Sequence, residues 1–135
     1  MELFERTVLE NGLTLEIWDE SRKIAADTVK VALTAKIEVV VKEEYLPGRD
    51  AYETVTKHFG DKVLFEYRKE RTFVDANEKD AVFKKLLEEF KEATLKYIVR
   101  PNFAAGFIAS KFMDIQRNPF KYRGGSGKPN LTVIN

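Results

Sequence analysis

The clearest pattern in the chain is an alternation of apolar and polar positions from Thr28 to Lys42. The odd-numbered positions, from Val29 to Val41, are all apolar, whereas most even-numbered positions are small or charged. Successive side chains of a β-strand leave it on opposite faces, so this alternation is typical of a strand with one buried face. It predicts the central strand of an antiparallel sheet.

This strand is long for the size of the chain. Residues 28–42 would span roughly 45 Å when extended, whereas a compact domain of this length has a diameter of about 36–40 Å. The strand is therefore expected to bend, to carry a bulge or to project, and the small residues Ala32, Thr34 and Ala35 favour a bend there. A projecting end would expose an unpaired edge to which a partner strand can add.

A β-hairpin is predicted near the N-terminus. Residues 4–9 and 13–18 flank Asn11-Gly12, a dipeptide that supplies the positive φ angles of a tight turn. In the second arm Trp18 is expected on the face opposite to the core, and the polar residues 19–27 predict a connection to the long strand. The positions of this arm expected in the core are Leu13, Leu15 and Ile17.

Three helices are predicted in the rest of the chain. Apolar residues recur at every third and fourth position in residues 75–99 and in residues 103–116, as they do on one face of a helix. A shorter helix is predicted for residues 49–59, with Asp50 as its N-cap and Gly60 as its C-cap.

Residues 62–74 alternate again and predict a strand, whose charged stretch 68–71 is expected at the edge of the sheet. The order β-β-β-α-β-α-α predicts an α+β fold with an antiparallel sheet of about four strands and helices packed on one face. Residues 1–123 are expected to form a single domain, and the glycine-rich residues 124–135 a flexible C-terminal tail.

The amino-acid composition excludes several classes of function. The 135 residues include no cysteine, which excludes disulfides, thiolate catalysis and cysteine-ligated metals. The net charge of +1 gives no global bias toward nucleic acid or membranes. The first residues lack the basic and apolar regions of a signal peptide, and no window approaches the roughly 18 apolar residues of a spanning helix. A cytoplasmic location without membrane contact is therefore expected.

The two ends of the chain differ in charge. Residues 1–20 carry six acidic side chains and one basic one, whereas residues 111–128 carry five basic side chains and one acidic one. Opposite charge would allow the ends to attract each other, within one chain or between two chains, but the favoured interpretation is that both runs are solvated faces.

Few residues are candidates for catalysis or metal binding. His58 is the only histidine, and without a second histidine or a cysteine the common zinc sites cannot form. Neither acidic group of the chain has the spacing of a calcium-binding loop. No catalytic residue, metal or cofactor is therefore predicted. The carboxylates considered for an acid–base pair or a hard cation are Glu16, Asp19 and Glu20, and separately Glu43 with Glu44.

Residues 111–123 interleave cations with aromatic rings. Rings that stack on bases and cations that follow phosphates are the requirements of single-stranded nucleic-acid binding. The opposing interpretation is that Phe112 and Phe120 pack in the core while the cations are solvated. The predicted nucleic-acid contacts are Lys111, Arg117, Lys121, Tyr122 and Arg123.

Together these patterns favour a non-enzymatic binding or assembly module that forms a homodimer or binds another protein. The reasons are the absence of a catalytic motif, the over-long strand and the unusually apolar helix at residues 103–116. One alternative is nucleic-acid binding through residues 111–123. Another is an enzyme or a small-ligand binder with a pocket between the sheet and the helices, near His58.

Overall fold

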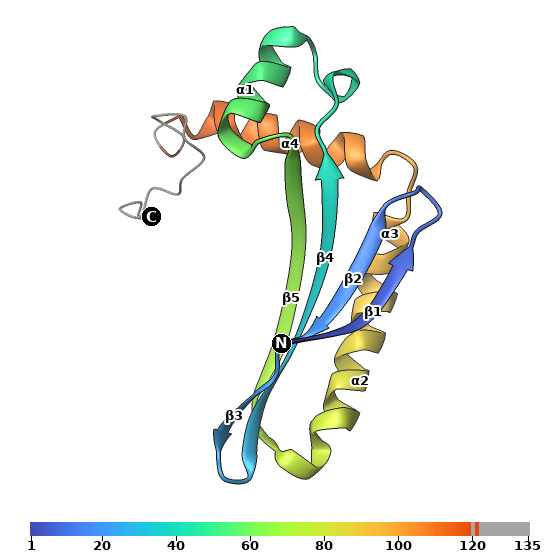
Figure 1. Ribbon diagram of the computed structural model, residues 1–135, viewed down its shortest axis with the longest axis vertical. Coiled ribbons are helices and arrows are strands. Elements are labelled where there is room, and N and C mark those ends of the chain that lie inside the picture. The colour runs from blue at the N-terminus through green and yellow to red at the C-terminus, as the bar shows by residue number, and fades with distance from the viewer. Residues whose placement is uncertain (120, 122–135) are drawn as a thin grey trace. The chain divides into compact units, whose positions relative to one another are not determined.

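The computed structural model describes residues 1–119 and residue 121. It confirms the α+β class, with helices packed on an antiparallel sheet that has five strands (Figure 1). The chain divides into two compact units: unit 1 is Met1–Ile37 with Phe65–Pro101, and unit 2 is Glu38–Leu64 with Asn102–Asn135. The strands are β1 (Glu2–Val8), β2 (Thr14–Asp19), β3 (Arg22–Ala25), β4 (Thr28–Val40) and β5 (Lys62–Asp75).

The sheet is built around β4. Strands β2, β3 and β5 all pair with β4, and β1 pairs with β2. The long predicted strand therefore has neighbours along its length. In the part of the chain that the structure describes, the strands with a single neighbouring strand are β1, β3 and β5. The pairing of β2 with β4 carries no register shift from Leu33 to Ile37, so no bulge in this ladder marks the small residues of β4.

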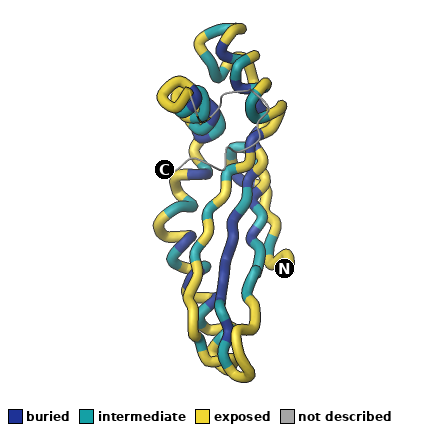
Figure 2. Tube along the Cα trace, turned by 90° about the vertical axis from the view of Figure 1, so that its left-hand side faces the viewer, coloured by how far each residue is buried: buried dark blue, intermediate teal, exposed yellow. Residues whose placement is uncertain are grey.

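The alternation predicted for β4 is confirmed. The even-numbered Ala32 and Thr34 are buried as well, and Thr34 is covered by the side chains of Glu20 and Arg68. The buried residues of β4 form the continuous dark blue run in the middle of Figure 2. The odd-numbered positions, all of them buried, are Val29, Val31, Leu33, Ala35, Ile37, Val39 and Val41.

The prediction of a polar connection at residues 19–27 is wrong, because this segment contains β3. Strand β3 continues the register of β2 along β4. At the junction the Ser21 hydroxyl accepts a hydrogen bond from Ala32 N–H (3.0 Å), and Glu20 N–H donates to Ala32 O (2.9 Å). All four residues of β3 are exposed, so no apolar alternation marks the strand in the sequence. This strand accounts for the difference between four predicted strands and five.

The N-terminal hairpin is confirmed. Gly12 has a φ of 89° and its N–H donates to Leu9 O (2.9 Å). The neighbouring Asn11 also makes two distant contacts, because its Nδ2 donates to Ile98 O and to Arg100 O, both at 2.8 Å. These carbonyls lie at the end of the long helix, so Asn11 fastens the hairpin turn to the helix that covers the sheet.

The long helix predicted for residues 75–99 is present as consecutive segments, one of them π-helical. It covers one face of the sheet in unit 1 through aromatic contacts. The ring centroids of Phe4 and Phe83 lie 5.0 Å apart, as do those of Tyr67 and Phe90. The segments are η2 (Ala76–Glu78, a 3₁₀ turn), α2 (Lys79–Phe90), η3 (Lys91–Leu95, the π-helical part) and α3 (Lys96–Ile98).

Unit 2 contains two helices that pack together. The shorter one ends at Gly60, which has a φ of 84° and acts as the predicted C-cap. The prediction of Asp50 as N-cap is wrong: Gly48 holds that position, and no side chain caps the helix. The extended backbone at Gly48 lets the helix begin one residue before Asp50. The helical segments are η1 (Glu43–Tyr45), α1 (Arg49–Phe59) and α4 (Phe103–Arg117), and α4 packs against both others.

None of the helices in the described part of the chain is long and apolar enough to cross a membrane.

Candidate functional site

Of the residues predicted to contact nucleic acid, the structure describes Lys111, Arg117 and Lys121. Lys111, on α4, places its Nζ 5.9 Å from the ring centroid of Phe59 and 5.2 Å from that of Phe107. The Nζ of Lys121 lies 3.8 Å from an oxygen of Asp114. Two of the predicted cations are thus already held over rings or beside a carboxylate. Arg117 is exposed at the end of α4, and Tyr122 and Arg123 lie outside the described residues.

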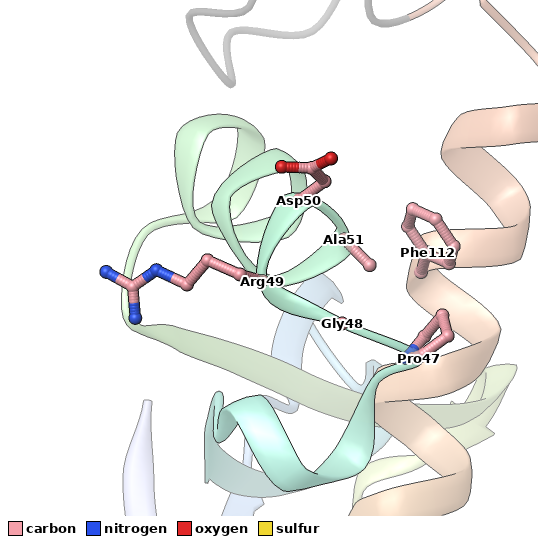
Figure 3. A pocket seen from close by; sticks show the side chains of 6 residues that line it. All are labelled: Pro47, Gly48, Arg49, Asp50, Ala51 and Phe112. Carbon is pink, nitrogen blue, oxygen red and sulfur yellow. The ribbon is translucent and has the colours of Figure 1, made fainter.

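A hollow of about 400 Å³ lies in unit 2, between the start of α1 and α4 (Figure 3). The side chains of Pro47, Ala51 and Phe112 face it, whereas Arg49 points away. Arg49 donates to Glu43 (2.9 Å) and to Glu53 (3.3 Å), and these hydrogen bonds raise the pKa of its guanidinium. The hollow is mostly apolar and offers little polar chemistry to a ligand. Phe112, predicted either to stack on bases or to pack in the core, lines this hollow.

On the helix-free face of the sheet in unit 1, charged side chains of several strands meet around Arg68. Arg68 pairs with Glu20, and its Nε lies 3.3 Å from an oxygen of Glu70. Thr34 Oγ1 donates to Glu20 (2.8 Å), and Lys30 Nζ lies 3.5 Å from Glu70. The Thr34 hydroxyl and the Arg68 guanidinium hold the pKa of Glu20 below its ordinary value. We call these five residues the Arg68 network.

A second group on the same face surrounds Trp18. The Nε and Nη2 of Arg6 lie 3.0 and 2.8 Å from Glu16 Oε2, and Trp18 Nε1 donates to Glu16 Oε1 (3.0 Å). These hydrogen bonds, the one from Arg6 above all, lower the pKa of Glu16. The Nζ of Lys36 lies 5.5 Å from the Trp18 ring centroid. The predicted orientation of Trp18, away from the core face, is consistent with these partners.

Asp19 belongs to the opposite, helix-covered face. Burial raises the pKa of its carboxyl, but hydrogen bonds from Ser21 and the Lys79 ammonium outweigh burial and lower the pKa overall. Lys79 Nζ lies 3.1 Å from Asp19 Oδ2. The three neighbouring carboxylates considered for acid–base chemistry or for a cation therefore each bind a basic side chain. Among the described residues no group of three or more acidic or histidine side chains could hold a metal ion.

The backbone of β5 provides a further candidate surface. Among the strands of the described residues it pairs only with β4, which agrees with the edge position predicted for its charged stretch. Val41 N–H donates to Asp61 O (2.9 Å), and backbone groups of an antiparallel strand point alternately to the two sides. Continued along β5 as far as Phe73, the register set by this hydrogen bond directs the N–H and C=O groups of the even-numbered residues away from β4, to the free edge. Sequence patterns indicated the edge but not which backbone groups are exposed, since that depends on the register.

The free edge of β5 is limited at one end by the backbone. Phe73 has a φ of 56°, an uncommon left-handed conformation for a residue with a bulky side chain. It interrupts the extended backbone that a partner strand would need. Within unit 1 the usable edge is therefore residues 65–72, which we call the β5 edge.

Comparisons with protein-family models, with curated proteins and with solved structures found no match.

Proposed function

We propose that this protein is a non-enzymatic binding or assembly module that recognises an extended strand by adding it to the β5 edge. The observation that carries the proposal is that β5, 14 residues long, has β4 as its single neighbouring strand within residues 1–119 and 121, the residues that the structure describes. An unpaired edge presents a row of N–H and C=O groups, which is the template used in β-strand addition. The cytoplasmic location expected from the sequence is part of the proposal.

The contrast with β1 and β3, the other strands with one neighbour, supports this choice. Strand β1 has 7 residues and carries a register shift between Leu3 and Glu5, and β3 has 4 residues. Short length and bulges are two of the devices by which proteins protect an edge from a partner strand; charged side chains, which β5 does carry, are another. Within residues 65–72 the sequence has neither proline nor glycine, so every even-numbered position offers both a donor and an acceptor.

The side chains of the β5 edge support a rigid template. Phe65, Tyr67 and Lys69 are half-buried, and Tyr67 packs on Phe90 of α2. The Lys69 ammonium and the Arg71 guanidinium lie 3.4 and 3.5 Å from Glu89. A strand held in this way loses little conformational freedom when a partner adds to it. Arg71 Nη1 also lies 3.5 Å from Glu70 O, a weak contact that a partner amide would replace.

The experiment uses a fluorescent peptide of sequence Phe-Glu-Tyr-Arg-Lys-Glu-Arg-Thr, identical to residues 65–72, titrated with the full chain and followed by fluorescence anisotropy. Saturable binding is expected. The same peptide N-methylated at its glutamate and arginine positions that match residues 66 and 68 should not bind, because the donors of its pairing edge are then blocked.

The matched protein variants are Glu66→Pro and Glu66→Ala. Both remove the carboxylate, but only proline removes the outward N–H, and β5 keeps its ladder with β4 because residue 66 points away from it. Peptide binding should survive in Glu66→Ala and be lost in Glu66→Pro, with both variants showing the circular dichroism of the original protein. Equal binding by folded Glu66→Pro, or no binding by the original protein, would contradict strand addition at the β5 edge.

A further inference from the structure

Along the β5 edge the charged side chains of the helix-free face alternate in sign: Glu66, then Arg68, then Glu70. Charges that merely protect an edge strand need no such alternation, because side chains of one sign repel a second copy more effectively. In an antiparallel pair of two identical strands, each residue before the two-fold axis faces a residue that lies after the axis in the other strand. The row can therefore be complementary to itself.

Glu66 is the member of this row that has no ion-pair partner among the described residues. Its side chain is exposed, and among the described residues it makes no ion pair. Arg68, two positions on and on the same face, is exposed on one side while it holds Glu20 and Glu70 on the other. An unpaired carboxylate next to a partly exposed guanidinium is the pair of groups that a symmetric contact needs.

We infer that the strand recognised by the β5 edge is the β5 edge of a second copy, paired antiparallel about a two-fold axis at Tyr67. This inference rests on the proposed strand addition at β5. In this register Tyr67 faces the Tyr67 of the other copy, and Glu66 of each copy faces Arg68 of the other. On the helix-covered face Phe65 lies opposite Lys69, a ring and a cation that attract each other.

The neighbouring registers are excluded by charge. An axis at Arg68 places two arginines together and Glu66 opposite Glu70. An axis at Glu66 places two glutamates together, and an axis at Lys69 does the same with two lysines. Like charges directly opposite destabilise a strand pair, so the axis at Tyr67 is the register in which no like charges meet within residues 65–69.

The outward backbone groups agree with this register. Within the β5 edge, residues 66, 68 and 70 direct N–H and C=O to the free side, and an axis at Tyr67 brings 66 of each copy opposite 68 of the other. Both of these are pairs of outward-pointing residues, so the hydrogen bonds of an antiparallel ladder form without a bulge. A contact of this length lies at the small end of specific interfaces, and we expect a dissociation constant of roughly micromolar.

The test uses sedimentation velocity of the full chain and of two single variants, Glu66→Arg and Arg68→Glu. Each variant alone should be monomeric, its self-association weakened about tenfold or more, because each places like charges opposite in both pairs. An equimolar mixture should form a heterodimer, since Arg at 66 then faces Glu at 68 and Arg68 faces Glu66. A matched control, Lys84→Glu on the exposed side of α2, should dimerise like the original protein.

A second measurement does not depend on Arg68, whose loss removes internal contacts. The chain has no cysteine, so a single cysteine can only cross-link to its own copy. Tyr67→Cys should form a disulfide-linked dimer under mild oxidation, because residues at the axis of this register approach within disulfide range. Lys69→Cys should cross-link far less, and thermal melting checks that both variants fold.

The outcomes separate the two proposals. A monomeric original protein that still binds the β5 peptide would overturn the second copy as partner and leave strand addition standing. In a further outcome, Glu66→Pro abolishes the dimer, but the mixture of Glu66→Arg and Arg68→Glu forms no heterodimer. This outcome would overturn only the register with its axis at Tyr67. Dimers that persist in folded Glu66→Pro would overturn the β5 edge as the contact between copies, and strand addition itself falls only if this variant also binds the peptide as the original protein does.

Discussion

Unit 1 and unit 2 place their basic side chains in different surroundings. In unit 1 most of those with a partner lie on carboxylates of other strands and helices, which joins segments far apart in the chain, and only Lys36 and Arg100 of the described residues are placed over rings alone. In unit 2 several lie over aromatic rings: Lys42 over Tyr45, Arg49 over Tyr52, and Lys111 over Phe59 and Phe107. Unit 2 also has carboxylate pairs, such as Arg49 with Glu43 and Lys121 with Asp114. The partners in unit 1 are Arg6–Glu16, Arg68–Glu20, Lys79–Asp19, Lys69–Glu89 and Lys91–Glu5.

This difference has a consequence for solution behaviour. Carboxylates gain protons in acid, whereas the rings of phenylalanine do not titrate and the ring of tyrosine does not titrate below neutral pH. The cross-strand contacts of unit 1 are therefore sensitive to acid, and the cation–ring contacts of unit 2 are not. Trp18, the only tryptophan, belongs to unit 1 and bonds to Glu16, so its fluorescence reports on unit 1.

The largest effect is expected from the core of unit 1. Phe90 is fully buried and packs on Tyr67, so Phe90→Ala should lower the free energy of unfolding by about 3–5 kcal/mol. Urea denaturation followed by Trp18 fluorescence measures it. Tyr97→Ala, at a half-exposed position of the same helix, is the control and should cost far less. Equal losses would show that α2 does not form the core of unit 1.

The second-largest loss of stability is expected when the contact between the hairpin turn and the helix end is removed. Asn11→Ala removes both hydrogen bonds to the carbonyls of Ile98 and Arg100, and should lower the free energy of unfolding by about 1–3 kcal/mol. Asn11→Asp keeps the oxygen that accepts from Leu13 N–H (3.1 Å) but loses the donors. It should be at least as destabilising as alanine. An Asp variant as stable as the original would refute the role of the distant carbonyls.

Acid should lower the stability of unit 1 more than that of unit 2. The pKa values of Glu16, Asp19 and Glu20 are lowered in the folded protein, so these groups stabilise it fully above their unfolded pKa values of about 4. That stabilisation is lost as the pH falls through the folded pKa values. Between pH 7 and 3 the urea midpoint seen by Trp18 should fall.

The matched variant for the acid effect is Glu20→Gln, which keeps the shape but not the charge. At pH 7 it should lower the free energy of unfolding by about 1 kcal/mol, a partly exposed ion pair being worth little more. Its stability should also depend less steeply on pH than that of the original protein. An unchanged pH dependence would mean that the Arg68 network does not respond to acid.

The smallest effect is expected in unit 2. Lys111→Met keeps the apolar stem over Phe59 and Phe107 and removes the charge, which should lower the free energy of unfolding by about 0.5–1 kcal/mol. Differential scanning calorimetry at pH 7 and pH 4 should give the same loss, since this contact has no carboxylate. A loss confined to pH 7 would show that a titrating group holds Lys111.

The elements with a strong local period could be predicted from the sequence. The alternation of β4, the Asn11-Gly12 turn and the three helices were all found in this way, because each pattern is set by neighbours within a few residues. Strand β3 was missed because a short exposed strand has no buried face to mark it. The candidate site was found only in part: the charged stretch of β5 indicated an edge, but its outward backbone groups and the unpaired Glu66 depend on the register.

The sequence by itself determined the fold class, the strand at the centre of the sheet and the absence of thiol chemistry. Each follows from composition or from a period that one segment carries alone. Only the tertiary structure decided that Glu20, Thr34 and Arg68 share one network, and that Asn11 reaches the end of the long helix. These partners lie far apart in the sequence. Local patterns do not specify which strands become neighbours or in what register they pair.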